Sequence, residues 1–148
     1  MKVIKLHSPG HQEIMRKVAP VGNVYQAGTL SGNPLAVSAG LAMLRHIRLH
    51  PGLYAQLEAS GASLCAGLPA GLTVNRMGSM FTLFFTETPV TDYETAKTSD
   101  TARFGKFFHH LLERGVYFPP SQFEAAFLST AHTAEDIAHT RGAIAEFF

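Results

Sequence analysis

The chain has 148 residues, of which 46% are hydrophobic and 16% are charged, and its net charge is +1. Such a composition suits one globular domain with a real core and excludes a disordered protein. The near-neutral charge gives no electrostatic reason to bind nucleic acid or an anionic membrane, and no apolar run approaches the length of a membrane span.

Two helices are predicted in residues 12–50. The stretch QEIMRKVAP begins a short helix at Gln12, which must end before Pro20. Asn33 and Pro34 begin the second helix, because an asparagine side chain caps the N–H groups of a first helical turn and proline presets the helical φ. We expect this helix to run to about Leu49, with small side chains in its first half that allow close packing against another element or subunit.

Residues 51–148 predict further helices and several short strands. In chain order these are a helix over 52–68, strands over 72–77 and 80–86, a loop or a short irregular turn over 88–97, a helix over 100–114, strands over 116–118 and 125–130, and a last helix capped by Thr133. Apolar residues repeat every three or four positions in the helices and alternate in the strand over 80–86. Strands and helices do not alternate singly, so we predict an α+β fold with helices packed on a small, mostly antiparallel sheet.

Cysteine and histidine side chains predict no catalytic or metal site. Cys65 is the only cysteine, so no internal disulfide can form, and we expect a cytoplasmic protein in which Cys65 packs as a small hydrophobe. His46 and His50 have the spacing of a metal-binding pair on a helix, but no third ligand accompanies them and no metal site is predicted. Adjacent histidines point about 100° apart on a helix, so we interpret His109 and His110 as surface residues.

The stretch VYQAGTLSGNPLAVSAG, residues 24–40, contains the strongest candidate for a binding site. Its turn cluster begins at Gly28, carries the hydroxyls of Thr29 and Ser31, and leads into the helix that Asn33 begins. A helix start offers unpaired N–H donors and the positive end of the helix dipole, where phosphate can bind. The alternative is a loop that only shapes the start of the helix, and the glycine spacing matches neither a P-loop nor a G-x-G-x-x-G turn.

The segment YQAGTLSGNPLA, together with the SAG that follows it, strongly resembles the glutamate-1-semialdehyde 2,1-aminomutase family. This family is similar to the class III aminotransferases, which are fold-type I enzymes that use pyridoxal 5'-phosphate (PLP). The resemblance covers nearly everything after Gln12, and it implies the C-terminal part of such an enzyme, with a long interdomain helix before a small C-terminal domain. It also implies conversion of glutamate-1-semialdehyde to 5-aminolevulinate in tetrapyrrole (porphyrin) biosynthesis.

The resemblance also implies roles for particular residues. Gly28 and Thr29 match a pair that contributes to the PLP phosphate site of the neighbouring subunit in a dimer. Glu124, in PPSQFEAAF, matches a glutamate near the active-site cleft, where a carboxylate can help to position an amino group. Tyr25 stands just before the loop, and we expect it to pack rather than to bind.

The resemblance fails before residue 12. The lysine that forms the Schiff base with PLP belongs just upstream of that point, but neither Lys2 nor Lys5 stands in the right context and we assign neither. We therefore divide the chain into a non-matching segment (1–11), a region of the phosphate loop and interdomain helix (12–50) and a small α+β domain (51–148). The chain alone is expected to be inactive.

Surface on residues 18–49 that belongs against a large domain or a second subunit would face water, so we expect a dimer or a larger self-association. Two alternatives remain. One is a part of another class III aminotransferase, such as an enzyme that acts on ω-amino acids, although the segment GSMFTLFFT favours the aminomutase. The other is a non-enzymatic module that pairs with a separate PLP-binding chain.

Overall fold

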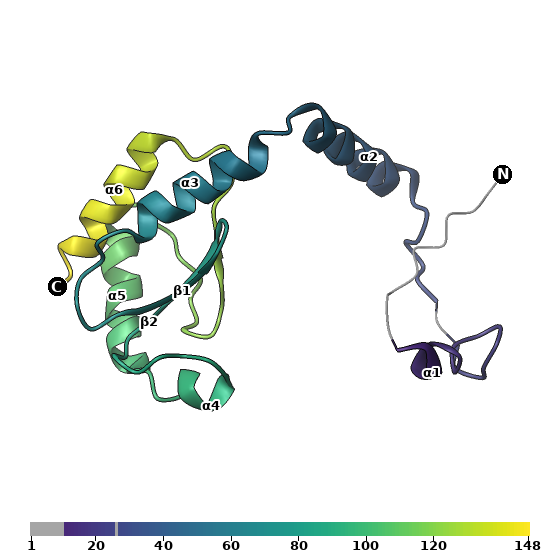
Figure 1. Ribbon diagram of the computed structural model, residues 1–148, viewed down its shortest axis with the longest axis horizontal. Coiled ribbons are helices and arrows are strands. Elements are labelled where there is room, and N and C mark those ends of the chain that lie inside the picture. The colour runs from purple at the N-terminus through teal and green to yellow at the C-terminus, as the bar shows by residue number, and fades with distance from the viewer. Residues whose placement is uncertain (1–10, 26) are drawn as a thin grey trace. The chain divides into compact units, whose positions relative to one another are not determined.

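A computed structural model of the chain describes residues 11–25 and 27–148. The chain divides into two units between Arg45 and His46, and each unit is described by itself. Figure 1 shows the helices and strands of both units. None of the helices in the described residues is both long enough and apolar enough to span a membrane.

The first unit contains α1 (Gln12–Met15) and most of α2 (Pro34–Leu49). The helix predicted up to Pro20 is therefore too long, since α1 is a single turn. Beyond it the main chain turns back on itself: the N–H of Ala19 donates to the carbonyl of Val24 at 2.8 Å, and the N–H of Val24 donates to that of Lys17 at 2.9 Å. These hydrogen bonds use the main-chain groups that would otherwise have paired along a longer helix.

Helix α2 begins where the sequence predicts. The Oδ1 atom of Asn33 accepts hydrogen bonds from the N–H groups of Leu35 and Ala36, each at 3.1 Å, as expected of a helix N-cap. No residue of α2 is buried. Its exposed apolar side chains are those of Leu35, Val37, Leu41, Met43, Leu44 and Leu49.

The second unit is built on a three-stranded antiparallel sheet in the order β1-β2-β3. β1 (Thr73–Met77) and β2 (Met80–Phe84) form a hairpin whose turn contains Gly78 at a φ of +60°, a conformation that glycine adopts without strain. β3 (Ala126–Phe127) pairs with the first half of β2, with Phe81 opposite Ala126. The predicted α+β fold with a small antiparallel sheet is confirmed.

Three helices, α3 (Leu53–Cys65), α5 (Thr101–Glu113) and α6 (Ala134–Ala145), gather around the hairpin (Figure 1). The predicted alternation in β2 is confirmed. Side chains on one face of this strand are buried together with side chains of the three helices, in a single hydrophobic cluster that we call the main core. The most deeply buried side chains are those of Phe107, Leu64, Leu111 and Ile144. On α5, Gly115 follows the helix with a φ of +76°, the left-handed conformation in which a glycine commonly ends a helix.

The last helix confirms its predicted cap. The hydroxyl of Thr133 accepts from the N–H of Asp136 at 3.2 Å, while a carboxylate oxygen of Asp136 accepts from the N–H of Thr133 at 2.7 Å. A similar capping box at Asp92 and Thr95 begins the short helix α4 (Tyr93–Ala96), where the sequence predicted a loop or a short irregular turn. Residues 88–97 are polar and lack an apolar helical repeat, so the sequence did not indicate this cap.

The strand predictions over 116–118 and 125–130 need correction. Residues 116–118 form no strand: Val116 and Phe118 are buried, but the N–H of Val116 donates to the carbonyl of Leu111 at 2.9 Å, and Pro119 and Pro120 have no N–H to extend a ladder. The strand predicted over 125–130 is reduced to the two residues of β3. The helix predicted over 52–68 ends at Cys65, and the strand over 80–86 ends at Phe84.

Only one of the two adjacent histidines is a surface residue. His109 is exposed, as predicted, but His110 is half-buried and its Nε2 atom lies 2.9 Å from the carbonyl oxygen of Ala143 on α6. Near it, the Nε atom of Arg114 lies 2.6 Å from the carboxylate of Glu146, which holds the pKa of that carboxyl below its usual range. Polar contacts therefore join the ends of α5 and α6.

Acid should destabilise the second unit through the cap of α6. Hydrogen bonds from the N–H and hydroxyl of Thr133 lower the pKa of Asp136 below 3.8 in the folded chain. A lowered pKa stabilises the fold above the ordinary pKa, and this contribution disappears as the pH falls through the folded value. We expect the urea midpoint of Asp136→Asn to fall less than that of the wild type between about pH 5 and pH 2.

The matched control for this measurement is Glu135→Gln, on the preceding position of α6. Its profile should follow the wild type, because no hydrogen bond of the Glu135 side chain occurs among the described residues. Parallel profiles for wild type and Asp136→Asn would show that the cap does not contribute to the acid sensitivity.

Candidate functional site

The predicted phosphate loop consists of two successive turns before α2. The N–H of Ser31 donates to the carbonyl of Gly28 at 3.0 Å, and the N–H of Asn33 donates to that of Leu30, also at 3.0 Å. A Cβ atom on Gly28 would lie 2.4 Å from the Oγ atom of Ser31, so a side chain at this position would displace the serine. Thr29, between them, is exposed to solvent.

The donors of this loop differ from those expected from sequence. Asn33 accepts the N–H groups of Leu35 and Ala36 through its side chain, and its carbonyl accepts that of Val37 at 2.9 Å. The first turn of α2 therefore has no unpaired N–H group to offer an anion, since Pro34 carries none. In residues 11–25 and 27–148, no hydrogen bond engages the hydroxyl or the main-chain N–H of Thr29. A hydroxyl and a turn N–H form a donor set that suits a phosphate group.

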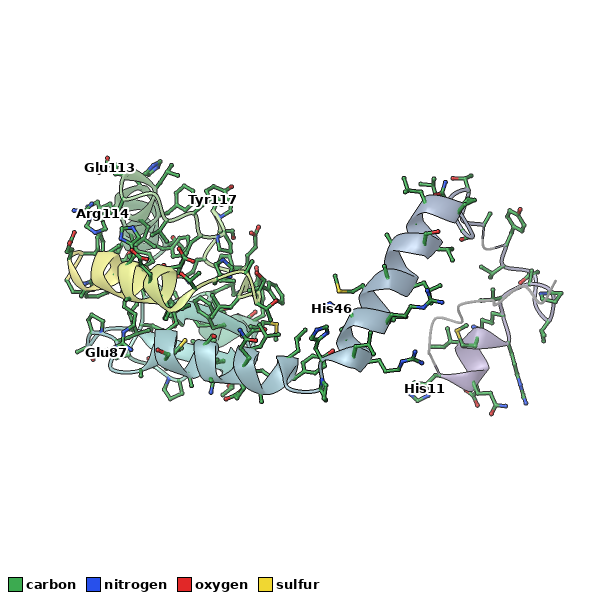
Figure 2. The ribbon with its side chains drawn as sticks, turned by 90° about the horizontal axis from the view of Figure 1, so that it is seen from above. His11, His46, Glu87, Glu113, Arg114 and Tyr117 are labelled. Atoms are coloured by element: carbon green, nitrogen blue, oxygen red, sulfur yellow. The ribbon has the colours of Figure 1, made fainter. Side chains whose placement is uncertain are left out.

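Glu124 lies in the second unit, on the segment between Pro120 and β3. Its side chain is exposed and lines a cleft of about 670 Å³ between this segment and α6. The floor of the cleft is apolar and includes Phe81 and Ile137 from the core. Its rim carries polar side chains from both walls: Tyr117, Glu124, His132, Asp136 and His139. Tyr117 is 72% exposed and lies at the outer surface of the unit (Figure 2).

The main chain at Glu124 is held in place by hydrogen bonds. Its N–H donates to the carbonyl of Ser121 at 3.2 Å, and its carbonyl accepts from the hydroxyl of Thr82, on β2, at 3.3 Å. Two residues earlier, Gln122 is only 3% exposed, and its side chain bonds to the main chain of Leu83, on β2, and of Phe85, just after that strand. The sequence analysis did not single out Gln122, because a lone glutamine in a loop carries no distinctive signal.

The other candidate residues show no binding geometry. Tyr25 is 83% exposed, so it does not pack as the sequence analysis expected. The Nδ1 atom of His50 lies 2.8 Å from the carbonyl oxygen of His46, and the two rings stack. Figure 2 shows His46 on α2. Within the part of the chain that the structure describes, no three histidine, cysteine or acidic residues gather to hold a metal ion.

Two further sequence predictions concern single residues. Cys65 is half-buried against the main core, and this burial raises the pKa of its thiol, which agrees with the predicted packing role. Lys2 and Lys5 lie outside the described residues. The candidate binding residues are therefore Gly28 and Thr29 in the first unit and Glu124 in the second.

Several curated relatives of this chain are glutamate-1-semialdehyde 2,1-aminomutases. Glutamate-1-semialdehyde 2,1-aminomutase of Thermus thermophilus is 58% identical over 142 residues, which cover 91% of this chain and 34% of the relative. The aminomutase of Myxococcus xanthus is 55% identical, over 94% of this chain and 34% of the relative. Glutamate-1-semialdehyde 2,1-aminomutase 2 of Brevibacillus brevis is 56% identical, over 88% of this chain and 32% of the relative. The chain spans about a third of the length of these relatives. No protein-family model matches it.

Several solved structures of similar fold are transaminases. An omega-transaminase from Sphaerobacter thermophilus superposes with a TM-score of 0.67 at 26% identity, over 93% of this chain and 33% of that one. A transaminase with PLP bound gives a TM-score of 0.62 at 25% identity, over the same shares of the two chains. Both the sequence and the fold thus confirm the resemblance noted from the loop motif: the chain corresponds to a C-terminal part of the glutamate-1-semialdehyde 2,1-aminomutases, with the fold of the C-terminal domain of PLP transaminases.

Proposed function

We propose that the chain forms the C-terminal part of a PLP-dependent enzyme that isomerises glutamate-1-semialdehyde to 5-aminolevulinate in tetrapyrrole biosynthesis. The observation that carries this proposal is the 58% identity to the Thermus aminomutase over 91% of the chain. The transaminases of similar fold are only 25–26% identical, which favours the aminomutase over an enzyme for ω-amino acids. The single cysteine supports a cytoplasmic location.

In this proposal, Gly28 and Thr29 bind the phosphate group of the PLP held by a neighbouring subunit. The hydroxyl and the main-chain N–H of Thr29 donate hydrogen bonds to phosphate oxygens, which are strong because the acceptor is charged. Gly28 keeps the turn tight, since a side chain there would meet Ser31. When bound, the cofactor would supply the electron sink and, in its pyridoxamine form, the amino group that is exchanged, while the protein binds and orients it.

Glu124 has a different proposed role. An exposed carboxylate at the rim of a cleft with an apolar floor can accept hydrogen bonds from a substrate ammonium group and so orient it. We therefore propose Glu124 as a carboxylate of the active site that positions the amino group of the substrate. Asp136, on the same rim, is a less suitable partner because its carboxylate is already hydrogen-bonded to Thr133.

The 148-residue chain alone is expected to be inactive and to self-associate as a dimer or larger. Its relatives are about three times as long, so most of the enzyme to which it corresponds lies outside the matched part. The exposed apolar side chains of α2 favour association, because apolar surface of this extent is usually covered.

A chimeric enzyme tests the proposed function. In this Thermus chimera, the chain replaces the matching C-terminal third of the Thermus thermophilus aminomutase. We expect the chimera to convert glutamate-1-semialdehyde to 5-aminolevulinate, whereas the chain alone with added PLP forms none. A folded chimera that binds PLP but forms no 5-aminolevulinate would contradict the proposal. Amino transfer from an ω-amino acid instead would identify another class III aminotransferase.

The phosphate-binding role predicts the effect of Thr29→Ala in the Thermus chimera. Loss of one hydrogen bond to a charged group costs about 1.5–3 kcal/mol, so the dissociation constant of PLP should rise by about 10-fold to 100-fold. Absorbance titration with PLP measures this change. The matched control is Thr130→Ala, an exposed threonine of the second unit, which should bind PLP like the parent chimera. Equal affinity of Thr29→Ala and Thr130→Ala would exclude Thr29 from the phosphate site.

A further inference from the structure

The main-chain ladder between β2 and β3 stops after two residue pairs. Phe81 lies opposite Ala126, and Met80 lies opposite Phe127. The same register, if continued, would bring Gln122 opposite Phe85. The chain turns instead, because the N–H of Glu124 donates back to the carbonyl of Ser121 at 3.2 Å. This turn removes the main chain of residues 122–125 from the sheet.

The side chain of Gln122 takes the place of the missing ladder. Its Nε2 atom donates to the carbonyl of Leu83 at 2.7 Å, and its Oε1 atom accepts from the N–H of Phe85 at 3.4 Å. A primary amide offers the same donor and acceptor as a peptide group, and here it can be oriented only one way, since Leu83 presents an acceptor and Phe85 a donor.

Burial makes these hydrogen bonds difficult to replace. Gln122 is 3% exposed, and Leu83 and Phe85 are each 4% exposed. Buried polar groups without partners destabilise a fold, because water cannot reach them. An apolar side chain at position 122 would leave the carbonyl of Leu83 and the N–H of Phe85 without their partners.

Gln122 and Thr82 hold Glu124 from both sides. The glutamine anchors the chain two residues before Glu124, and the hydroxyl of Thr82 donates to the carbonyl of Glu124 itself at 3.3 Å. Thr82 and Leu83, the residues of these two hydrogen bonds on the sheet side, both lie on β2, whose Phe81 and Leu83 belong to the main core. The main chain of Glu124 is thus joined to the rigid part of the unit, while its side chain lines the cleft.

We infer that Gln122 is a positioning residue that holds Glu124 at the cleft by replacing main-chain hydrogen bonds of β2 with its side-chain amide. This inference rests on the active-site role proposed for Glu124. Gln122 does not itself have to touch substrate or cofactor. Removing the Gln122 amide should slow the reaction only through its effect on Glu124. This dependence on Glu124 distinguishes Gln122 from a residue that merely supports the fold.

A double-mutant cycle in the Thermus chimera tests this coupling. Gln122→Met keeps the length of the side chain but removes both hydrogen bonds, and Glu124→Gln removes the carboxylate. We expect each single variant to lower kcat at least about 10-fold, and the double variant to be within about twofold of Glu124→Gln alone. Gln56→Met, an exposed glutamine on α3, is the matched control and should leave kcat unchanged. Losses that multiply, or an unchanged kcat for Gln122→Met, would overturn the inference.

Amide hydrogen exchange in the whole 148-residue chain gives a second readout that needs no activity. Gln122→Met should speed exchange of the N–H groups of both Phe85 and Glu124 at least about 10-fold, and leave that of Phe107, inside α5, unchanged. Faster exchange at Phe85 alone would mean that Gln122 does not hold Glu124. If Glu124→Gln leaves the chimera fully active, the proposed role of Glu124 is wrong, and hydrogen exchange still decides whether Gln122 holds this residue.

Discussion

Phe107→Ala should lower the free energy of unfolding of the chain by about 3–5 kcal/mol. The side chain of Phe107 is completely buried, and the rings of Phe85 and Phe147 lie at 5.1 and 5.3 Å from it between centroids. Truncation removes the transfer free energy of the ring and leaves a cavity that neighbouring rings from different elements cannot fill together. A loss of this size is a large fraction of the stability of a small domain.

Urea unfolding followed by circular dichroism measures this loss. The matched control is Leu112→Ala on the same helix, whose side chain is 45% exposed, so its truncation should cost less than about 1.5 kcal/mol. The two variants change helix α5 in similar ways but differ in burial. Equal losses of stability for Phe107→Ala and Leu112→Ala would show that Phe107 and the rings around it are not the centre of the core.

Gly61→Ala should destabilise the chain by about 1–3 kcal/mol, although alanine is the better helix former. A Cβ atom at Gly61 would lie 2.3 Å from the carbonyl oxygen of Gly78, in the turn of the β1–β2 hairpin. The nearest atom belongs to the main chain, so it cannot move aside like the end of a side chain. Helix α3 and the hairpin would have to separate, which would also disturb the hydrogen bond of 2.8 Å from Arg76 to the same carbonyl.

A glycine-to-alanine substitution at another helical position provides the control for the predicted loss of stability. Gly142→Ala, on α6, places its Cβ atom where nothing lies within 4 Å, so it should stabilise the chain by about 0.5–1 kcal/mol through helix propensity. Thermal or urea unfolding of both variants gives the comparison. If Gly61→Ala stabilised the chain like Gly142→Ala, the close approach of α3 to the hairpin would be wrong.

Sequence patterns predicted much of the fold because their causes are local. Asn33 and Thr133 cap helices through bonds to residues two or three positions away, and Gly78 links two strands that are adjacent in the chain. The recognition motif of residues 24–40 is also continuous in sequence, and the comparisons confirm the family that it indicated. The short helix α4 has the same kind of local cap at Asp92, within a polar stretch that has no apolar repeat to indicate a helix.

Predictions failed where the partner of a residue lies far along the chain. Val116 and Phe118 alternate like strand residues, but no neighbouring strand pairs with them, so they remain irregular. A glycine inside a helix ordinarily weakens it, whereas the close approach of Gly61 to Gly78 gives this residue a packing role. His110 was assigned to the surface, and it is half-buried because α6 packs beside it.

The candidate site likewise combines features that follow from local sequence with features that depend on contacts distant in the chain. The sequence by itself determined the family and the identities of Gly28, Thr29 and Glu124 as residues to test, because each depends on a short continuous motif, while the order of the predicted helices and strands determined the α+β class. The local cap at Asn33 leaves the first turn of α2 no N–H group for phosphate, whereas only the tertiary structure decided that Gln122 anchors the segment that carries Glu124. Gln122 meets Leu83 across 39 positions of sequence, and nothing in the residues around either one indicates that they will meet.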